Sequence, residues 1–323
     1  MRAIVREKYG TADVLELRDI DTPVMTDDDV LVRVRAASVN PYDWHVVTGV
    51  PYIARLVTGL RRPKSHLLGA DFAGIVEAAG SNVRHLRPGD EVFGAGTGSF
   101  AEQLCVRADR AVAPKPENLT FAQAAAVPLA AITALQALRN KGRIQAGQKV
   151  LINGASGGVG TFAVQLAKAF GAEVTAVCST RNVDAIRSIG ADHVIDYTQE
   201  DFTRTGRRHD LMLDIAGNRS WSECKRVLAD GATLVIVGGP KTNRWIGSLG
   251  VAVRRRIAAV IGTRTVVWFV ATMNAEDLAV LRDLLETARM TPVVERQCEL
   301  SETPEALRYV GQGHAQGKIV ITT

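Results

Sequence analysis

Residues 150–160 read Val-Leu-Ile-Asn-Gly-Ala-Ser-Gly-Gly-Val-Gly, and this stretch decides the fold. An apolar, strand-like run leads into Gly157 and Gly158, and an alanine-rich segment typical of a helix follows. Glycines let the backbone approach a pyrophosphate, and a helix N-terminus offers N–H groups and partial positive charge to an anion. The register departs from G-x-G-x-x-G because Ala155 occupies the place of the first glycine. We predict a dinucleotide-binding turn, the alternative being a glycine-rich structural turn.

The sequence after this turn alternates between strand-like and helix-like runs. Helices are predicted to end near Gly171 and Gly190. The predicted strands are 149–153, 173–178, 193–196, 211–214, 233–237 and 266–270. Repeated strand–helix units with such apolar strands are typical of a parallel sheet covered on both faces.

The first third of the chain has a different sequence pattern, in which short strand-like runs are separated by Gly, Pro and Asp. The predicted strands are 30–34, 74–78, 90–93 and 101–106. A helix capped by Thr120 is predicted to run to Leu138, after a linker near residue 116. The tail reads as helix 275–288, strand 292–295, helix 303–310 and strand 318–322, and we expect it to return to the first domain.

Beyond the glycines, the strand ending at Cys178 is followed by Ser179, Thr180 and Arg181. A site that prefers NADH places Asp or Glu here to bind the ribose 2′-hydroxyl. Arg181 could instead pair with a 2′-phosphate. We therefore predict NADPH as the cofactor, although Arg181 could equally be a solvated residue at the start of the next helix.

Composition limits the other classes of function. The chain has 323 residues, 46% hydrophobic, and a formal net charge of +5, which is enough for two domains and gives no strong sign of nucleic acid. The basic runs 61–64 and 254–256 lack interleaved aromatic residues and are expected to be solvated faces. No membrane segment, signal peptide or Cys-x-x-Cys pair is found, so a cytoplasmic location with no membrane partner is expected.

The order of these segments along the chain resembles that of the medium-chain dehydrogenase/reductase family, most of all its zinc-independent quinone oxidoreductase branch. The resemblance is carried by residues 37–43, 68–77, 88–92, 153–160, 190–197 and 317–320. It implies an α/β fold, a Rossmann-type doubly wound parallel sheet plus a GroES-like β-rich catalytic domain. Residues 1–122 would form the catalytic domain, 123–272 the NADPH-binding domain and 273–323 the return to the catalytic domain.

Alcohol dehydrogenases of this family hold a catalytic zinc through a Cys and a Gly-His-Glu segment, where this chain has Asn40 and Gly69-Ala70-Asp71. No metal site is therefore expected. Without a Lewis acid, reduction of an already electrophilic acceptor is favoured over alcohol oxidation. The resemblance thus implies hydride transfer from NADPH to a quinone or an activated enone.

The resemblance also implies two sets of site residues. The catalytic candidates are Asn40, Asp43, Tyr52 and Thr133. The cofactor-binding candidates are Thr133, Asn153, Gly154, Gly157, Gly158, Val159, Ser179, Thr180, Arg181, Tyr197, Ala216, Gly238, Phe269 and Lys318. Structural alternatives stay open for several of them: Asn40 could turn the chain, Asp43 could cap a helix, Thr133 could bond its own helix, and Tyr197 could pack as an ordinary aromatic residue.

Two other functions stay open. An enoyl-thioester reductase would use Tyr52 as its acid, although Tyr52 stands one position out of register with the tyrosine of those enzymes. A non-catalytic NADPH-binding accessory protein would bind RNA through residues 61–64 or 254–256. Relatives in this family commonly form homodimers through the edge of the cofactor sheet, here 266–270.

Overall fold

The computed structural model describes residues 1–238, 263–313 and 315–323. By its internal contacts the chain divides into two compact units. The first unit comprises Met1–Ile132 and Thr272–Thr323, and the second comprises Thr133–Ala271. The boundary that the sequence places after residue 122 falls inside helix α3 (Phe121–Ala125) of the first unit.

The second unit contains a six-stranded sheet in the order β10-β9-β8-β11-β12-β13, with every neighbouring pair parallel. The strands are β8 (Lys149–Asn153), β9 (Glu173–Cys178), β10 (His193–Asp196), β11 (His209–Asp214), β12 (Leu228–Ile236) and β13 (Thr265–Trp268). Strands β8, β9 and β10 have the predicted bounds. The strand order reverses between β8 and β11, and in open α/β sheets ligands bind outside the carboxyl ends of the strands at such a point.

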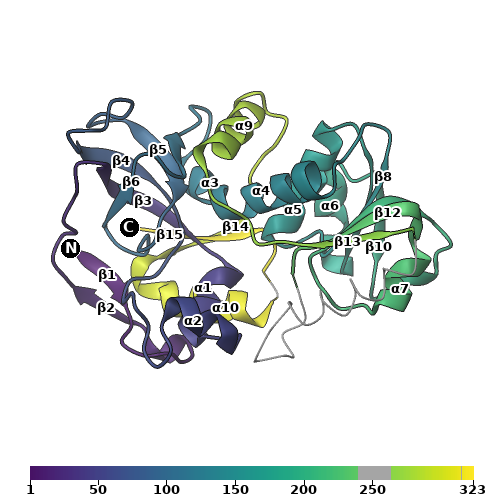
Figure 1. Ribbon diagram of the computed structural model, residues 1–323, viewed down its shortest axis with the longest axis horizontal. Coiled ribbons are helices and arrows are strands. Elements are labelled where there is room, and N and C mark those ends of the chain that lie inside the picture. Colours follow the sequence, from purple (N-terminus) through teal and green to yellow (C-terminus); the bar gives the residue numbers. More distant parts are fainter. Residues whose placement is uncertain (239–262, 314) are drawn as a thin grey trace. The chain divides into compact units, whose positions relative to one another are not determined.

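Helices cover both faces of this sheet, with α5 (Gly158–Ala169) on one side and α7 (Trp221–Arg226) on the other (Figure 1). Between them in the chain lie η4 (Thr180–Asn182), α6 (Val183–Ser188) and η5 (Phe202–Arg204). On the α7 side, Cys224 packs in a buried apolar cluster with Leu151, Met212 and Leu234 of the strands. This burial of alternate strand residues fixes the register of the sheet.

The helix predicted over residues 120–138 is instead three elements. Thr120 caps α3 as predicted, accepting a hydrogen bond from the Gln123 backbone N–H. Helix α4 (Pro128–Leu135) begins at Pro128, which has no backbone N–H and restricts the residue before it. A π-helical segment, η3 (Gln136–Lys141), continues from α4. The continuous prediction was wrong because it ignored Pro128.

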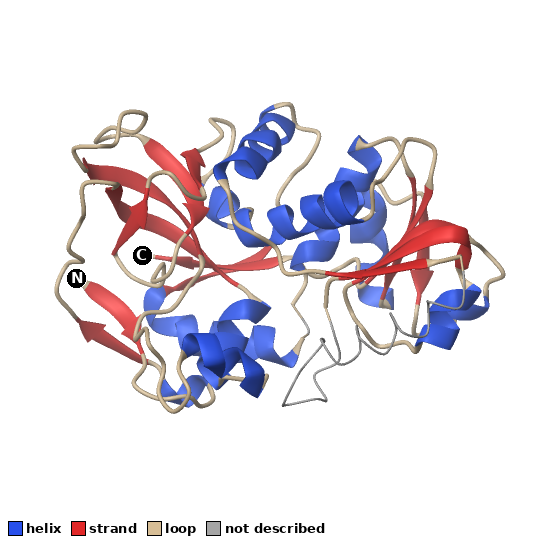
Figure 2. Cartoon of the chain, viewed as in Figure 1, coloured by secondary structure: helices blue, strands red, loops and turns tan. Residues whose placement is uncertain are grey.

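The first unit is dominated by strands (Figure 2). Its main sheet has the order β14-β15-β3-β4-β5-β7, with β6 also paired to β3, and β1 and β2 form a separate antiparallel pair. The strands are β1 (Arg2–Val5), β2 (Glu16–Asp19), β3 (Asp29–Val39), β4 (Asp71–Ala79), β5 (Glu91–Ala95), β6 (Gln103–Arg107), β7 (Val112–Pro114), β14 (Val294–Glu299) and β15 (Lys318–Thr322). Strand β15 pairs antiparallel with β3, so the tail of the chain lies in this sheet.

Short helices complete the first unit. They are η1 (Ala12–Val14), α1 (Pro41–Thr48), η2 (Tyr52–Ala54), α2 (Arg55–Thr58), α3, most of α4, α9 (Ala275–Glu286), η6 (Leu300–Glu302) and α10 (Thr303–Gln312). The core packs Val34, Phe72, Leu104 and Ile319 of the sheet against Leu307 of α10. The predicted fold class, a Rossmann-type parallel sheet with a GroES-like β-rich domain, is confirmed.

Candidate active site

Three glycines shape the turn between β8 and α5, each for a different steric reason. Gly154 has a φ of +93°, a conformation that residues with a Cβ rarely adopt. A Cβ at Gly160 would lie 2.2 Å from the Gly154 carbonyl oxygen, so Gly160 permits close packing of helix and strand. At Gly157, in contrast, the nearest atom to an added Cβ lies 3.9 Å away. The open space beside Gly157 fits the approach of a ligand to the backbone.

The first turn of α5 can bind an anion. Its N-cap residue is Gly157, which has no side chain to accept hydrogen bonds from the following N–H groups. The first N–H groups of a helix have no partner within the helix. Gly158 and Val159 therefore present backbone donors at the positive end of a helix of 12 residues.

Asp214 organises the carboxyl ends of β8 and β11. Its buried carboxylate accepts hydrogen bonds from the Asn153 side-chain amide at 2.9 Å and from the Gly217 backbone N–H at 3.0 Å. The Asn153 amide also donates to Asn218 at 3.0 Å. Asn153 thus joins the glycine turn to the loop after β11. Sequence reasoning missed Asp214, although an acid closing an otherwise apolar strand was a usable signal.

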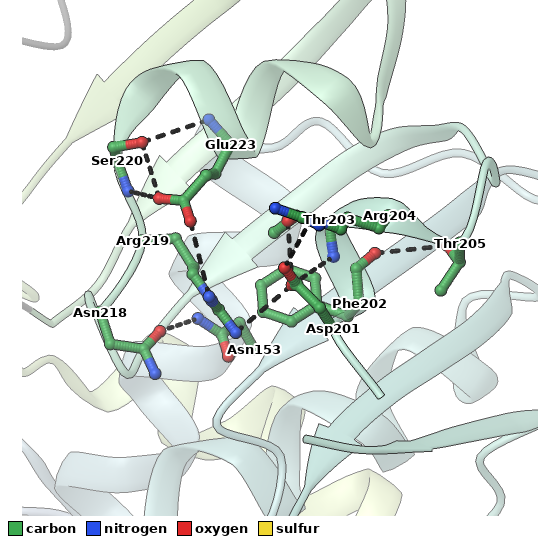
Figure 3. Close-up of polar contacts among 10 residues, drawn as sticks. All are labelled: Asn153, Asp201, Phe202, Thr203, Arg204, Thr205, Asn218, Arg219, Ser220 and Glu223. Atoms are coloured by element: carbon green, nitrogen blue, oxygen red, sulfur yellow. Dashed lines mark hydrogen bonds and ion pairs between the residues drawn. The ribbon is translucent and has the colours of Figure 1, made fainter. Parts of the chain in front are cut away.

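A network of charges holds the same loop (Figure 3). The Arg219 guanidinium lies between the carboxylates of Asp201 and Glu223, at 3.4 and 3.5 Å, and stacks on the Phe202 ring with 5.2 Å to its centroid. Glu223 in turn accepts hydrogen bonds from the backbone N–H and hydroxyl of Ser220, which caps α7. The loop carrying the predicted cofactor residue Ala216 is therefore fixed on both sides.

The carboxyl ends of three strands meet at close range. The Ala216 backbone N–H donates to the Asn153 carbonyl, and it lies 3.1 Å from where a Cβ on Gly154 would be. A Cβ on Gly238 would lie 2.0 Å from the Ile215 carbonyl oxygen. The structure therefore brings Asn153, Gly154, Ala216 and Gly238 together at the switch point, and close backbone packing explains why position 238 is glycine.

Ser179, Thr180, Arg181 and Tyr197 gather at the ends of β9 and β10, because the Tyr197 backbone N–H donates to the Cys178 carbonyl. Arg181 is exposed. The Asp196 carboxylate, which the sequence analysis did not consider, accepts hydrogen bonds from the Thr180 hydroxyl at 2.6 Å and from the Thr198 hydroxyl at 2.8 Å. The hydrogen bond from Thr180, first among several, lowers the pKa of Asp196.

Two further predicted cofactor residues lie elsewhere in the second unit. Thr133 is half-buried in α4 and is the first residue of the second unit. Phe269 follows β13, and the Lys141 ammonium of η3 lies 5.9 Å from its ring centroid. The π-helical segment that follows Thr133 thus contacts the residue that follows the last strand of the sheet.

The first unit contains a buried polar cluster formed by Ser38, Asn40, Asp71 and Lys318. The Lys318 ammonium donates to the Asn40 side-chain oxygen and lies 3.3 Å from Asp71 Oδ2. Asp71 Oδ2 also accepts from the Ser38 hydroxyl at 2.8 Å and from the Asn40 amide at 2.9 Å. Burial lowers the pKa of Lys318, while Asp71 and Asp43 act in the opposite direction. These contacts engage both the oxygen and the nitrogen of the Asn40 side chain.

Asp43 lies beside this cluster in the first turn of α1. Its carboxylate accepts a hydrogen bond from the Asn40 backbone N–H at 2.8 Å, so Asp43 does close the helix start. The side chain is buried, with 1% relative exposure. Burial raises the pKa of Asp43 to about 7, the backbone hydrogen bond from Asn40 opposing this and the Asp71 charge adding to it. Asp43 can therefore hold a proton near neutral pH.

The cluster also binds the start of α4. The second carboxylate oxygen of Asp71, Oδ1, accepts a hydrogen bond from the Leu129 backbone N–H at 2.9 Å. A carboxylate at a helix N-terminus is stabilised by the unpaired N–H groups and by the helix dipole. Asp71 therefore connects β4, β15 and the helix that carries Thr133.

The last catalytic candidate, Tyr52, belongs to η2. The Arg55 guanidinium lies 4.7 Å from the centroid of its ring and 4.4 Å from that of Tyr9. The Arg55 Nε donates to the Gly49 carbonyl at 2.9 Å. The orientation of the Tyr52 ring is therefore set by stacking on Arg55.

Comparison with known proteins identifies the family. Residues 26–117 match the alcohol dehydrogenase GroES-like domain, and residues 189–321 match the family described as zinc-binding dehydrogenase. The mitochondrial NAD(P)H oxidoreductase RTN4IP1 of Mus musculus is 34% identical over 99% of this chain and 89% of its own length. The chloroplastic NADPH-dependent alkenal/one oxidoreductase of Arabidopsis thaliana is 33% identical over 99% of this chain and 79% of its own. The chain belongs to the medium-chain dehydrogenase/reductase family.

A solved structure extends the likeness to the fold of the whole chain. The quinone oxidoreductase from Coxiella burnetii superposes with a TM-score of 0.87 at 32% identity, covering 100% of this chain and 99% of that one. The predicted membership of the quinone oxidoreductase branch of the medium-chain dehydrogenase/reductase family is confirmed, and the chain is an oxidoreductase of that family.

One of the matched descriptions names zinc, but the side chains at the corresponding site of this chain do not suit that metal. Zinc needs several ligand atoms with free lone pairs converging on one point. Asn40 and Asp71 do converge, but on the Lys318 ammonium, a cation that would repel a metal. Within residues 1–238, 263–313 and 315–323, no three His, Cys, Asp or Glu side chains are grouped to hold a metal. The residues do not fit a zinc site.

Proposed function

We propose that the protein transfers a hydride from NADPH to a quinone or an activated enone. The observation that carries this proposal is the turn at residues 154–160, where close packing requires Gly160 while the space beside Gly157 is open. The names of the relatives, an NAD(P)H oxidoreductase, an alkenal/one oxidoreductase and a quinone oxidoreductase, support the same reaction class.

The chain's own residues would bind the cofactor in three places. The backbone N–H groups of Gly158 and Val159 would donate to the pyrophosphate. Asn153, held by Asp214, would fix the turn at the switch point. Phe269 and Gly238 would border the nicotinamide half. The bound cofactor supplies the hydride, and the protein contributes alignment and exclusion of water.

A preference for NADPH over NADH would come from Arg181. Its guanidinium can form charge-assisted hydrogen bonds with a 2′-phosphate. The acid nearest in the sheet register, Asp196, opposes Cys178 but is already engaged by the hydroxyls of Thr180 and Thr198. Asp196 is therefore less available to a ribose 2′-hydroxyl than a free carboxylate would be.

On the acceptor side, the buried cluster would act in two ways. Asn40, with its amide engaged by Lys318 and Asp71, would hold the end of β3 and the start of α1 in place. Asp43, which is almost fully buried and accepts a hydrogen bond from the Asn40 backbone N–H, would hold the start of α1 beside Asn40. Tyr52 is the candidate proton donor, and protons from water would suffice for a reduced quinone.

The test is a titration of the purified protein with NADPH and NADH, followed by nicotinamide fluorescence, and then a panel of quinones and enones followed by NADPH absorbance. Gly157→Val is the informative variant because a Cβ added there would lie 3.9 Å from its nearest neighbour, and the new side chain would occupy the ligand's space. We expect wild type to bind NADPH and the variant to keep its melting temperature while losing binding at least 100-fold. Equal binding by both proteins would contradict the proposed turn; binding without turnover would leave a non-catalytic accessory role.

Location and assembly remain predictions. No helix in the described parts of the chain has the length and apolarity to cross a membrane. Two of the relatives named above are mitochondrial and chloroplastic, so the predicted cytoplasmic location is a proposal. The predicted homodimer would use β13, which stands at the end of the strand order among the described residues. The RNA-binding alternative through residues 254–256 lies outside the described residues.

A further inference from the structure

One short segment of the first unit exposes its apolar side chains to solvent and turns its polar side chains toward the protein. Residues 53, 56 and 57 are Ile, Leu and Val, a spacing of i, i+3 and i+4 that places them on one face of a helical segment, and Leu60 follows just beyond the helix end at Gly59, whose φ is +119°. Elements η2 and α2 form most of that segment. Ile53 is 41% exposed, Leu56 67%, Val57 76% and Leu60 67%. The apolar face of this amphipathic segment is therefore turned to solvent.

The polar residues of the same segment face the protein. Arg55 donates to the backbone carbonyls of Gly49 and Thr48 and stacks on Tyr9. The Thr58 hydroxyl lies 2.9 Å from the Tyr9 hydroxyl, which also donates to the Gly59 carbonyl at 2.7 Å. These contacts fix the orientation of the segment, so the exposure of its leucines is built into the fold rather than incidental.

Exposed cations follow this apolar face in the chain. Besides Arg55, which faces the protein, residues 44–70 contain Arg61, Arg62 and Lys64 and no Asp or Glu. Arg61, Arg62 and Lys64 are exposed, and the ion pairs found among the described residues include none of them. Glu7, whose pKa is lowered chiefly by Arg18 and in small part by Arg62, already pairs with Arg18 at 2.8 Å.

We propose that residues 53–64 form a docking surface for an anionic phospholipid bilayer. A row of exposed aliphatic side chains followed by a cluster of cations has the chemistry of an interfacial anchor, in which the apolar face enters the acyl boundary and the cations meet the headgroups. The apolar row also disfavours nucleic acid, which is bound by cations with aromatic side chains for stacking. Side chains that are two-thirds exposed do not line an enclosed ligand cavity.

The docking surface is independent of turnover, and it adds to the proposed function a reason for access to acceptors. Quinones and enones with apolar tails partition into bilayers, so an enzyme held at the surface would meet them at high local concentration. This link rests on the proposed function, whereas the binding itself does not. The basic run 61–64 was expected from the sequence to be a solvated face, and no membrane partner was expected for the chain. In this proposal the run binds lipid headgroups instead.

The experiment is co-sedimentation of the full-length protein with vesicles of phosphatidylcholine alone and of phosphatidylcholine containing 30% phosphatidylserine. We expect binding to the anionic vesicles only, weakening as salt is raised because the charges become screened. The apolar variant Leu56→Ser/Leu60→Ser is expected to lose at least tenfold in affinity for each leucine. The basic variant Arg61→Gln/Arg62→Gln/Lys64→Gln should lose about 100-fold, from roughly fivefold for each cation.

Two matched controls separate the patch from general surface properties. Val24→Ser removes an apolar side chain that is 92% exposed elsewhere in the same unit. Arg84→Gln/Arg87→Gln/Arg110→Gln removes three exposed cations outside residues 53–64. Both controls should bind anionic vesicles like wild type, and all variants should reduce a water-soluble quinone at the wild-type rate if the proposed function holds.

Four results would overturn the docking surface. Wild type could remain in the supernatant with anionic vesicles at 50 mM salt. The controls could lose as much binding as the patch variants. The protein could shift an RNA oligonucleotide while ignoring vesicles, in which case the cations serve nucleic acid. Light scattering could show a dimer that Leu56→Ser/Leu60→Ser converts to a monomer without any vesicle binding, in which case a second copy covers the leucines. None of these outcomes depends on NADPH, so failure of the docking surface and failure of the proposed reaction are distinguishable.

Discussion

Replacing Lys318 by Met tests whether the buried cluster depends on its cation. Methionine is close to lysine in length and apolar, so the change removes a charge with little change in volume. Lys318 is 3% exposed, and the Asp71 side chain beside it is fully buried. Removing one partner of a buried ion pair leaves an uncompensated charge and typically costs about 3–5 kcal/mol. Asp43, which also interacts with Lys318, adds to that cost.

Hydrogen exchange shows which strands lose stability in Lys318→Met. Lys318 begins β15, and β15 pairs with β3 from Ile319 to Thr322. A loss of about 3–5 kcal/mol in the free energy of local opening corresponds to a decrease of roughly 100-fold to 3,000-fold in protection, at about 1.4 kcal/mol for each factor of ten. Mass spectrometry of peptides covering β15 and β3 measures this decrease. Peptides covering β8, in the other unit, provide the internal reference.

Two further variants decide how the loss is interpreted. In Asp71→Asn/Lys318→Met both charges are gone, so at least half of the lost protection should return. Lys115→Met removes another buried lysine of the same unit, which donates to the Pro116 and Leu119 carbonyls and pairs with Glu91, a carboxylate that is 49% exposed. Because no buried charge is left behind, it should cost less than Lys318→Met, about 1–3 kcal/mol. Protection in Lys318→Met within threefold of wild type would refute the reasoning. Equal losses in Lys115→Met and Lys318→Met, with no recovery in the double variant, would do the same.

Three other variants test the site. The raised pKa of Asp43 means that its unfolded carboxyl ionises near pH 4 and its folded carboxyl near pH 7, so wild-type stability should fall across that range and level off above it. Urea titrations at pH 5 and pH 8 should show a difference of up to about 3 kcal/mol from this group in wild type, and Asp43→Asn should lack it. Arg181→Ala should weaken NADPH binding about 10-fold to 100-fold with NADH binding unchanged, and equal losses for both would exclude a 2′-phosphate contact. Tyr52→Phe should leave quinone reduction within threefold of wild type, whereas a large loss of kcat on enoyl thioesters with KM retained would favour the enoyl-thioester alternative.

The sequence predicted the second unit best where apolar runs are bounded by glycines. Strands β8 and β9 lie where the pattern placed them, because strands that are buried on both faces are rich in apolar residues. Strand β10, which is only partly buried, also has its predicted bounds. The prediction failed at α4, where the alanine-rich composition concealed the interruption at Pro128 and the π-helical continuation at Gln136–Lys141. Composition indicates helical tendency, whereas the hydrogen-bond register within a helix depends on tertiary packing.

Only part of the candidate site could be predicted from the sequence, and the reason differs from that for α4. The glycine turn is local, so its residues stand next to one another in the chain. Lys318 contacts Asn40 and Asp71 across 278 and 247 residues, and a single sequence contains no signal for such a pairing. Asp71 was for this reason absent from the predicted site, whereas Asp214 was missed despite the local signal of an acid at the end of an apolar strand. The predicted role of Lys318 in cofactor binding remains a prediction.

The position of Lys318 gives a physical reason why this chain should differ chemically from the zinc-dependent alcohol dehydrogenases. Asn40 stands in place of their zinc-binding Cys, and Ala70 stands in place of the histidine of their Gly-His-Glu segment. Asn40 and the neighbouring Asp71 both contact an ammonium here. An ammonium balances the Asp71 charge as a metal would, but its donors are directed at protein groups and it has no vacant coordination position for an alkoxide. Such an ammonium would stabilise a developing alkoxide only weakly. An acceptor that delocalises the incoming charge over its own electrons does not need that stabilisation. That requirement is met by quinones and activated enones, which is the acceptor class proposed here.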